Sequence, residues 1–298
     1  MDLMTSRKLR FAIFGNSSQA SKSAAIHEVM AALAARGAGV CIDREYYDFL
    51  VSSGLMPACG AEVFEGDAFD ASFVISMGGD GTFLKAAGRV GAKEIPILGV
   101  NMGRLGFLAD ITPGEFGGCL DMLAAGDYMV ESRAVISVCA DGEPLEGCGF
   151  ALNDVAILKR DNASMISIRT MINGEYIATF QADGLIVSTP TGSTAYSLSN
   201  GGPIIVPGTG VFAMTAVAPH SLNIRPIVIS DDSEITFAVE SRSHNFLVAV
   251  DGRSEKCPDV TRLTLRKAPY RVRIVKRSGT RYFDTLREKM MWGADTRR

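Results

Sequence analysis

The sequence predicts an α/β plus all-β fold, in which an N-terminal parallel α/β domain precedes a C-terminal antiparallel β domain. The chain has 298 residues; because a single hydrophobic core rarely grows that large, we expect two domains of roughly 100 to 150 residues each. In residues 9–125, short apolar runs alternate with segments of helical period, as in parallel α/β domains. In residues 126–275, short β-branched or alternating segments follow one another, as in antiparallel β domains.

The expected elements of the first domain alternate between strand and helix. They are a strand at 9–14, a helix at 22–35, a strand at 40–42, a helix at 45–53, a strand at 73–76, a helix at 82–90, a strand at 95–100 and a helix around 115–125. Ligands of such domains bind at the carboxyl ends of the strands. The loops that follow the strands are therefore the places to look for a site.

The second domain is expected to consist of short strands. They are placed at 129–139, 150–158, 165–172, 175–180, 184–188, 235–239, 246–250, 262–265 and 271–275. Asn173-Gly174 separates two of these runs and predicts a two-residue hairpin, because both residue types tolerate positive φ. Residues 282–292 have helical propensity, but local pattern does not assign them to either domain.

Composition excludes several classes of protein. The sequence is 47% hydrophobic and 21% charged, unlike a disordered chain, and its formal net charge of −3 gives no reason to expect nucleic acid or a membrane surface as a partner. No run approaches the roughly 20 apolar residues of a membrane span, and the N-terminus lacks a secretory signal, so we expect a cytoplasmic protein. The six cysteines form no CxxC pair and predict buried thiols rather than a metal site held by the protein.

A glycine-rich loop, Gly78-Gly79-Asp80-Gly81-Thr82, lies where a buried strand ends and a helix begins. Glycines let a ligand approach the backbone, and the N–H groups of a helix N-terminus bind anions, so phosphate is the expected ligand. Lys85, one turn into the helix, is placed to offset phosphate charge. The alternative is a purely structural tight turn with Asp80 as helix N-cap. Neither of the common phosphate fingerprints, GxxxxGK[ST] and GxGxxG, occurs in the chain.

A second loop combines hydroxyls, glycines and an aromatic ring. Asp183-Gly184 opens a strand that leads into Thr189-Pro-Thr-Gly-Ser-Thr194-Ala-Tyr196-Ser-Leu-Ser199. Hydroxyls suit phosphate or ribose oxygens, and the face of Tyr196 suits a purine. A structural Ser/Thr loop between two strands is the alternative. Together with the glycine loop, this segment indicates a ligand that contains both phosphate and sugar.

These motifs, in their order and spacing, closely resemble the bacterial ATP-dependent NAD kinases. The resemblance covers nearly the whole chain. Gly-Gly-Asp-Gly alone also occurs in phosphofructokinases and diacylglycerol-type lipid kinases, whereas Thr-Pro-Thr-Gly-Ser-Thr-Ala-Tyr is far more specific. The other matching segments are Gly99-Val-Asn101-Met-Gly103-Arg-Leu-Gly106-Phe107-Leu-Ala-Asp110, Leu152-Asn153-Asp154, Gly201-Gly202-Pro203, and Tyr282-Phe283-Asp284-Thr285-Leu286 through Trp292.

The resemblance implies transfer of the γ-phosphoryl group of ATP to the 2′-hydroxyl of the adenosine ribose of NAD, giving NADP. It implies domains at residues 1–125 and 126–275, a C-terminal segment 276–298 that returns to the first domain, and a nucleotide held in an interdomain cleft. It also implies Mg²⁺ or another divalent cation that arrives with ATP, and a homodimer or homotetramer in which a neighbour contacts the dinucleotide. A lipid or sugar kinase, or a dinucleotide-binding regulator without turnover, are the competing hypotheses.

The resemblance also assigns roles to single residues. Asp80 is the proton acceptor, and since a carboxyl of ordinary pKa is ionised at pH 7, it either accepts the hydroxyl proton or orients that oxygen. The nucleotide-binding candidates are Gly78, Gly79, Gly81, Thr82, Lys85 and Asn101; Asn153 and Asp154 toward adenosine; Asp183 toward nicotinamide; Thr194, Tyr196 and Ser199 toward adenine; and Gln181, Ala195, Ser197 and Arg253. Three of these depart from the family pattern: Asp154 stands where Glu is common, Arg253 where Gln is usual, and Gln181 where some members have Arg.

Overall fold

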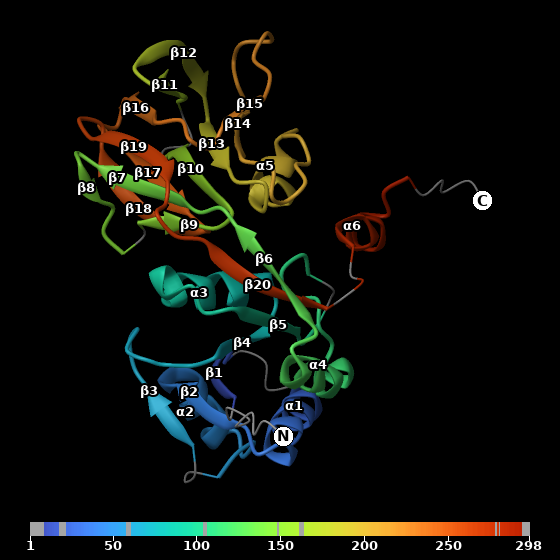
Figure 1. Cartoon of the computed structure of the whole chain (residues 1–298). Helices are drawn as coiled ribbons and strands as arrows, with labels where there is room; N and C mark the ends of the chain where they lie inside the picture. Colours follow the sequence, from blue (N-terminus) through green and yellow to red (C-terminus); the bar gives the residue numbers. More distant parts are fainter. Residues whose placement is uncertain are drawn as a thin grey trace. The chain divides into compact units, whose positions relative to one another are not determined.

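The computed structural model describes residues 9–17, 22–57, 61–103, 106–147, 149–160, 164–277, 279 and 281–293 (Figure 1). The chain divides into two compact units. The first unit contains residues 1–132 and 272–298, and the second contains residues 133–271. No helix among the described residues is long and apolar enough to cross a membrane.

The first unit is built on one sheet with the strand order β3-β2-β1-β4-β5-β20-β6. The pairs from β3 through β20 are parallel. The strands are β1 (Arg10–Gly15), β2 (Gly39–Asp43), β3 (Glu62–Phe64), β4 (Phe73–Gly78), β5 (Ile97–Asn101), β6 (Tyr128–Arg133) and β20 (Val272–Arg277). The helices are α1 (Ser23–Ala35), α2 (Arg44–Ser52), α3 (Asp80–Val90), α4 (Pro113–Ala125) and α6 (Tyr282–Met290), with a short 3₁₀ turn η2 (Gly91–Lys93).

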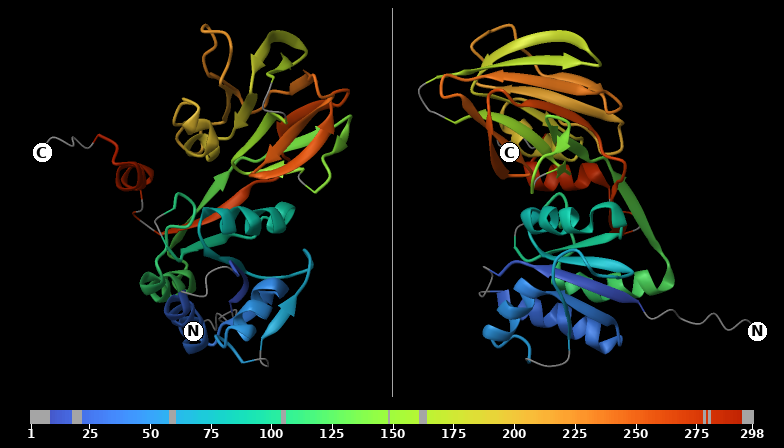
Figure 2. Two further views of the ribbon diagram at one scale, coloured as in Figure 1. Left: turned by 180° about the vertical axis from the view of Figure 1, so that it is seen from behind. Right: turned by 90° about the vertical axis from the view of Figure 1, so that its left-hand side faces the viewer.

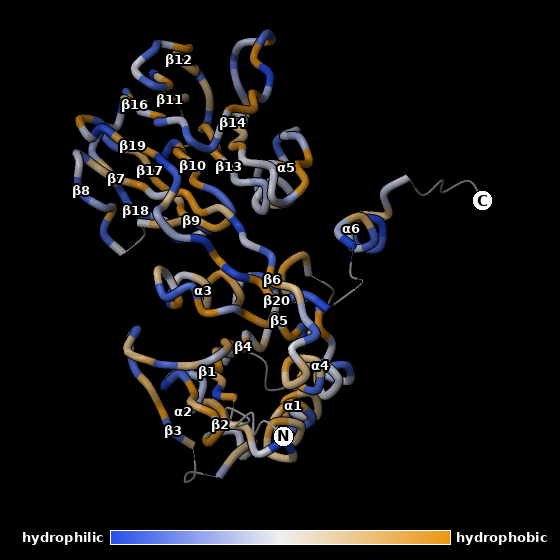
Figure 3. Tube along the Cα trace, in the orientation of Figure 1, coloured by the Kyte–Doolittle hydropathy of each residue, from blue (hydrophilic) through white to orange (hydrophobic). Residues whose placement is uncertain are grey.

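Helices cover both faces of this sheet, with α1, α2 and α4 on one face and α3 on the other (Figures 1 and 2). Every residue of β4 is buried, as expected for a central parallel strand. Phe73, Ile75 and Met77 belong to the core shared with α1 and α4, and the hydrophobic colouring along β1 and β5 in Figure 3 follows the same layer. The sheet is therefore a buried central layer, and its loops provide the exposed groups.

The ends of the second unit differ from the sequence expectation. Residues 129–139 were expected to form one strand and residues 271–275 another, both in the β domain. Instead β6 and β20 belong to the sheet of the first unit, where β20 pairs with β5 in parallel. The alternating pattern of β20 predicts a strand correctly, but its choice of sheet depends on a long-range pairing that no local pattern contains.

The second unit consists of two antiparallel sheets. One has the order β15-β14-β13-β10-β17-β18, and the other has the order β12-β11-β16-β19-β7-β8, with β9 also paired to β7. The first contains β10 (Asp154–Lys159), β13 (Gly184–Ser188), β14 (Val211–Val217), β15 (Ile227–Ser230), β17 (Asn245–Val250) and β18 (Arg253–Pro258). The second contains β7 (Ile136–Ala140), β8 (Glu143–Pro144), β9 (Phe150–Ala151), β11 (Ile166–Ile172), β12 (Glu175–Ala182), β16 (Ile235–Glu240) and β19 (Arg262–Lys267).

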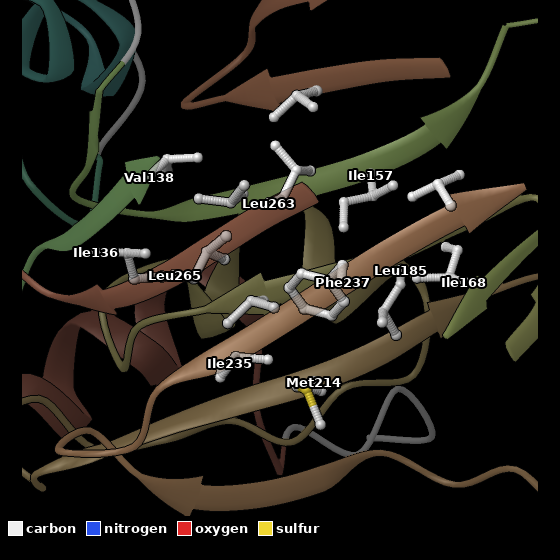
Figure 4. Packing of buried hydrophobic residues seen from close by; sticks show 14 of the residues in the cluster. Ile136, Val138, Ile157, Ile168, Leu185, Met214, Ile235, Phe237, Leu263 and Leu265 are labelled. Carbon is white, nitrogen blue, oxygen red and sulfur yellow. The ribbon is translucent and has the colours of Figure 1, made fainter. Parts of the chain in front are cut away.

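Side chains from the two sheets form one core in the second unit (Figure 4). Ile168 and Phe237 of one sheet belong to the same buried cluster as Ile157, Leu185 and Met214 of the other. The two sheets thus bury one face each, and a 3₁₀ turn η3 (Gly192–Thr194) and a short helix α5 (Tyr196–Ser199) form the connection that follows β13.

The hairpin at Asn173-Gly174 is confirmed: β11 pairs with β12 around it, and the two residues have φ values of 52° and 81°. Five strands of the described residues were not predicted: the short strands β3 and β8, and β14, β15 and β18. The polar edge strand β18 has no apolar alternation, β15 is largely exposed, and the apolar run of β14 does not distinguish strand from helix by period. Helix α3 begins at Asp80, two residues before the expected start.

Candidate active site

The loop between β4 and α3 has the conformation of an open helix N-terminus. Gly79 is the N-cap, and its carbonyl accepts the N–H groups of Thr82 and Phe83 at 3.0 and 3.1 Å. The alternative in which Asp80 caps the helix is therefore wrong, since Asp80 is already the first helical residue. A Cβ on Gly78 would lie 2.2 Å from Thr82 Oγ1, whereas Gly79 and Gly81 have no atom within 4 Å of an added Cβ. Two of the three glycines thus border open space.

That open space is a cavity of about 420 Å³ within the first unit. It is lined by Gly15, Asn16, Ser17, Glu45, Gly79, Gly81, Thr82 and Lys85. Thr82 and Lys85 lie on the same side of α3 because they are one turn apart. The N-terminus of an 11-residue helix lies at this cavity, and the positive end of the helix dipole makes the cavity suitable for an anion.

Lys85 has a carboxylate partner, Glu45. Its Nζ lies 2.6 Å from Glu45 Oε2, at the start of α2. The hydrogen bond and charge of Lys85 lower the pKa of Glu45. Both side chains are more than 45% exposed, so the pair adds little stability and exchanges readily for other partners. Glu45 was not among the candidates, because nothing in its local pattern indicates that α2 reaches this cavity.

Asp80 is held by a second loop of the same unit. Its Oδ2 accepts the main-chain N–H of Phe107 at 3.0 Å, and its Oδ1 accepts those of Leu108 and Ala109, both at 3.1 Å. Lys289 Nζ of α6 lies 3.3 Å from Oδ2. Burial acts to raise the pKa of Asp80, but the three N–H groups and the Lys289 charge outweigh it and lower the pKa. Asp80 is therefore a fixed carboxylate anion at neutral pH.

Asn101 organises the loop that holds Asp80. It is buried at the end of β5, its Oδ1 accepts the N–H of Gly103 at 2.7 Å, and its own N–H donates to Ile111 at 2.7 Å. At the end of this loop Asp110 forms a largely buried ion pair with Lys276 of β20. Asn101, at the carboxyl end of β5, therefore stabilises the loop that holds Asp80.

In the second unit, Asn153 and Asp154 lie beside a carboxylate that the sequence analysis did not select. Asp251 accepts the N–H groups of Leu152, Asn153 and Asp154 at 2.8, 2.8 and 3.1 Å. Asp251 and Gly252 have φ values of 47° and 81° in the β17–β18 hairpin. The Asp-Gly dipeptide is a hairpin signal. It is the one feature of the sequence that draws attention to Asp251.

The two buried carboxyl groups influence each other. Burial, reinforced by the charge of Asp251, raises the pKa of Asp154 to about 7, although the N–H of Tyr196 opposes the change. Burial also raises the pKa of Asp251, against the three N–H groups that it accepts. Of the three departures from the family pattern, Asp154 is thus the one that changes charge near physiological pH.

The hydroxyl-rich loop after β13 is fixed to the same turn. Thr189 Oγ1 donates to Leu152 O at 2.6 Å, and its N–H donates to Asn153 O at 2.9 Å. A Cβ on Gly192 would lie 2.0 Å from Asn153 O, so glycine is required for this close approach. The loop and the Asn153-Asp154 turn therefore form one rigid structure.

The candidates within this loop fall into two groups. Tyr196 and Ser199 are exposed, and Thr194 and Ala195 are half-buried, so these four are accessible to a ligand. Ser197 is fully buried, with its hydroxyl 3.0 Å from Thr215 Oγ1. The hydroxyl of Ser197 thus stabilises the loop from inside.

The remaining candidates lie elsewhere on the second unit. Asp183 accepts Lys159 Nζ at 2.7 Å. Gln181 donates to Ser167 Oγ at 2.6 Å and borders a second cavity of about 700 Å³, whose lining includes Lys159 and Arg242. Arg253 is exposed on β18, and its guanidinium donates to Gly147 O at 3.3 Å.

Solved structures share this fold. The yeast NADH kinase crystal structure in complex with NADH matches with a TM-score of 0.85 and 21% identity, over 97% of this chain and 89% of that one. The crystal structure of an NAD kinase from Archaeoglobus fulgidus in complex with ATP matches with a TM-score of 0.70 and 25% identity, over 95% and 99% of the two chains. The fold and the glycine loop thus define a nucleotide-dependent kinase class.

Sequence comparison makes the assignment specific. Residues 13–128 match the ATP-NAD kinase N-terminal domain and residues 152–277 the ATP-NAD kinase C-terminal domain. NAD kinase of Bacteroides fragilis is 57% identical over 289 residues, which are 97% of this chain and all of the relative. NAD kinase of Porphyromonas gingivalis is 42% identical over 290 residues, covering 97% and 99% of the two chains. The chain belongs to the NAD kinase family.

Proposed function

We propose that this chain transfers the γ-phosphoryl group of ATP to the 2′-hydroxyl of the adenosine ribose of NAD, giving NADP. The observation that carries the proposal is the position of Asp80. It is a fixed carboxylate in the first turn of α3, next to glycines that border an open, anion-suited cavity. Membership in the NAD kinase family supplies the substrates.

The glycine loop is proposed to bind the phosphates. Gly79 and Gly81 leave room for phosphate oxygens to approach the N–H groups of α3, and the Thr82 hydroxyl lines the same space. Lys85 offsets phosphate charge by exchanging its exposed partner Glu45 for the nucleotide. In-line phosphoryl transfer depends mainly on such positioning and charge stabilisation.

Asp80 is proposed to orient the attacking 2′-hydroxyl. A carboxyl whose pKa is lowered is a weak proton acceptor, but it remains an ionised hydrogen-bond acceptor across the neutral range. Since phosphoryl transfer passes through a loose transition state, alignment of the hydroxyl contributes more than early removal of its proton.

The second unit is proposed to bind the dinucleotide. Asn153 and Asp154 hold the adenosine, while Thr194, Tyr196 and Ser199 contact the adenine side. The hydrogen bonds from Thr189 to the 152–153 main chain support this role, because they preorganise both groups together. Asp183, beside Lys159, is proposed to face the nicotinamide end.

A divalent cation, Mg²⁺ or an equivalent, is proposed to enter with ATP and to neutralise phosphate charge. Within the described part of the chain, no group of three or more His, Cys, Asp or Glu side chains lies close enough together to hold a metal. The cavity lining does contain hard oxygen donors, the Thr82 hydroxyl and the Glu45 carboxylate. Such a donor set suits Mg²⁺, which is commonly held by substrate phosphates and few protein ligands.

The assembly and compartment are proposed as a homodimer or homotetramer in the cytoplasm. Ile227 and Val228 on the sheet-edge strand β15 are 39% and 48% exposed, and nearby in sequence Leu222 is 87% exposed, which supports a self-association surface. Cys41, Cys119, Cys139 and Cys257 are free thiols, as is usual in a reducing compartment. Light scattering coupled to size-exclusion chromatography measures the subunit number.

A coupled assay tests the proposed activity. Purified protein is incubated with ATP, Mg²⁺ and NAD, and NADP is detected with an NADP-specific dehydrogenase. We expect NADP to form only when all three are present. ATP consumption with a lipid or a hexose phosphate but not with NAD favours a lipid or sugar kinase, and NAD binding without ATP consumption favours a regulator without turnover.

A further inference from the structure

The C-terminal helix contributes a charged group to the surroundings of Asp80. Lys289 Nζ of α6 lies 3.3 Å from Asp80 Oδ2 and 4.5 Å from the centre of the Phe107 ring. The Lys289 and Asp80 side chains are 31% and 30% exposed, so the pair is partly shielded from water. An ammonium group at this distance from both a carboxylate and an aromatic face interacts favourably with each.

The sequence of α6 explains why Lys289 points toward this loop. Tyr282, Leu286 and Lys289 follow the i, i+4, i+7 spacing of one helix face. Leu286 is only 3% exposed, and the Tyr282 ring lies 6.4 Å from that of Phe107. The helix therefore docks through two apolar anchors, which bring the lysine at the end of the same face to Asp80.

We propose that Lys289 is a positioning residue for phosphoryl transfer, which holds the Asp80 carboxylate in its orientation and balances its charge when the polyphosphate binds. This inference rests on the proposed function. The three N–H groups of residues 107–109 fix the carboxylate from one side, and Lys289 adds a positive charge from a separate element, α6. Without that charge, the carboxylate and the nucleotide phosphates repel each other across the first turn of α3.

Lys289→Met tests the charge while keeping an apolar side chain over Phe107. Lys289→Arg keeps the charge, and Arg287→Met is the matched control, because Arg287 lies on the same helix but pairs with Asp284. The coupled NADP assay and thermal melting are measured for all three variants and the wild type. We expect Lys289→Met to lose at least about tenfold in kcat, with KM for NAD within about threefold and an unchanged melting temperature. Lys289→Arg recovers kcat to within about threefold of wild type, and the control stays within about twofold.

The outcomes separate this inference from the proposed function. If the wild type forms no NADP, the proposed function fails and the inference fails with it. If the wild type is active and Lys289→Met keeps at least half of its kcat, the inference alone is overturned. Equal losses in Lys289→Met and Lys289→Arg also overturn it, because a charge-based role requires rescue by arginine. If Lys289→Met does not fold, Lys289→Gln replaces it under the same criteria.

Discussion

Gly106 lies directly against Asp80, so that a Cβ on Gly106 would be 2.0 Å from Asp80 Oδ1. The same Cβ would lie 3.0 Å from the carbonyl oxygen of Ala109, which accepts the Gly106 N–H. Asp80 Oδ1 also accepts the N–H of Ala109. The placement of the Asp80 carboxylate therefore requires glycine at position 106, in the loop that binds it.

Replacing Gly106 with alanine is expected to displace this carboxylate. The added methyl group forces the loop or the Asp80 side chain to move, which costs about 1–3 kcal/mol of stability and lowers kcat at least about tenfold. The control is Gly103→Ala in the same loop, where the nearest atom to an added Cβ is 4.0 Å away. Chemical denaturation and the NADP assay measure both effects. Equal behaviour of the two variants contradicts the packing account.

Gly81→Val tests whether the open space at the loop is used by a ligand. Gly81 lines the 420 Å³ cavity and no atom lies within 4 Å of a Cβ added there, so the melting temperature of the ligand-free protein should hardly change. Nucleotide binding should weaken at least about tenfold, because the side chain occupies the space of a phosphate. Gly118→Val, at a helical glycine with an equally open environment in α4, controls for helix propensity. Parallel losses of stability and activity favour a structural turn instead.

Asp154→Asn should change how stability depends on pH. The pKa of Asp154 is raised to about 7 in the folded protein, so its contribution to stability is fully present below the unfolded pKa near 4 and is lost as pH rises through 7. The variant should therefore be more stable than wild type at pH 8, by on the order of 1–3 kcal/mol, and the gain should shrink toward pH 5. Denaturation at both pH values measures this, with the exposed Asp48→Asn as control. A gain that is equal at pH 5 and pH 8 refutes the assignment.

Arg253→Gln tests what arginine does at a position where NAD kinases usually have glutamine. The guanidinium is exposed, its one described hydrogen bond is to Gly147 O, and its charge acts to lower the pKa of the nearby Asp251. We expect the guanidinium to reach a phosphate of the ligand or a protein carboxylate that borders the ligand, so the variant should raise a nucleotide KM by about threefold to tenfold with little change in melting temperature. Steady-state kinetics with each substrate varied decides the question, and two unchanged KM values exclude the role.

Local pattern was enough to predict those features that local physics determines. The strand–loop–helix at Gly78–Thr82 and the Asn173-Gly174 hairpin follow from backbone preferences, and the structure has both. The acceptance of three N–H groups by Asp80 and the docking of Lys289 were not predictable, since their partners are 27 to 29 and 209 positions away in the chain. The sheet that β20 joins was missed for the same reason.

Burial also separates residues that look alike in the sequence. Ser197 and Ser199 both lie in the hydroxyl-rich loop, yet Ser197 is buried against Thr215 and Ser199 is exposed. Asp251 was passed over because its Asp-Gly turn looks like an ordinary hairpin, whereas its carboxylate organises the Asn153-Asp154 turn. Roles of this kind follow from packing, which a list of motifs does not contain.

The turnover of Asp80→Asn is the most direct test of the central claim, that the fixed Asp80 carboxylate aligns the 2′-hydroxyl of NAD for phosphoryl transfer. The asparagine side chain has only one oxygen that can accept hydrogen bonds. At least one of the N–H groups of residues 107–109 would therefore face the amide NH₂ and lose its acceptor. The melting temperature should fall by a few degrees as a result. NAD affinity, measured by titration on the same preparation, should stay within about tenfold of wild type, while kcat for NADP formation falls at least about 10²-fold. A kcat within about fivefold of wild type in folded protein would contradict the claim and leave Asp80 a structural residue.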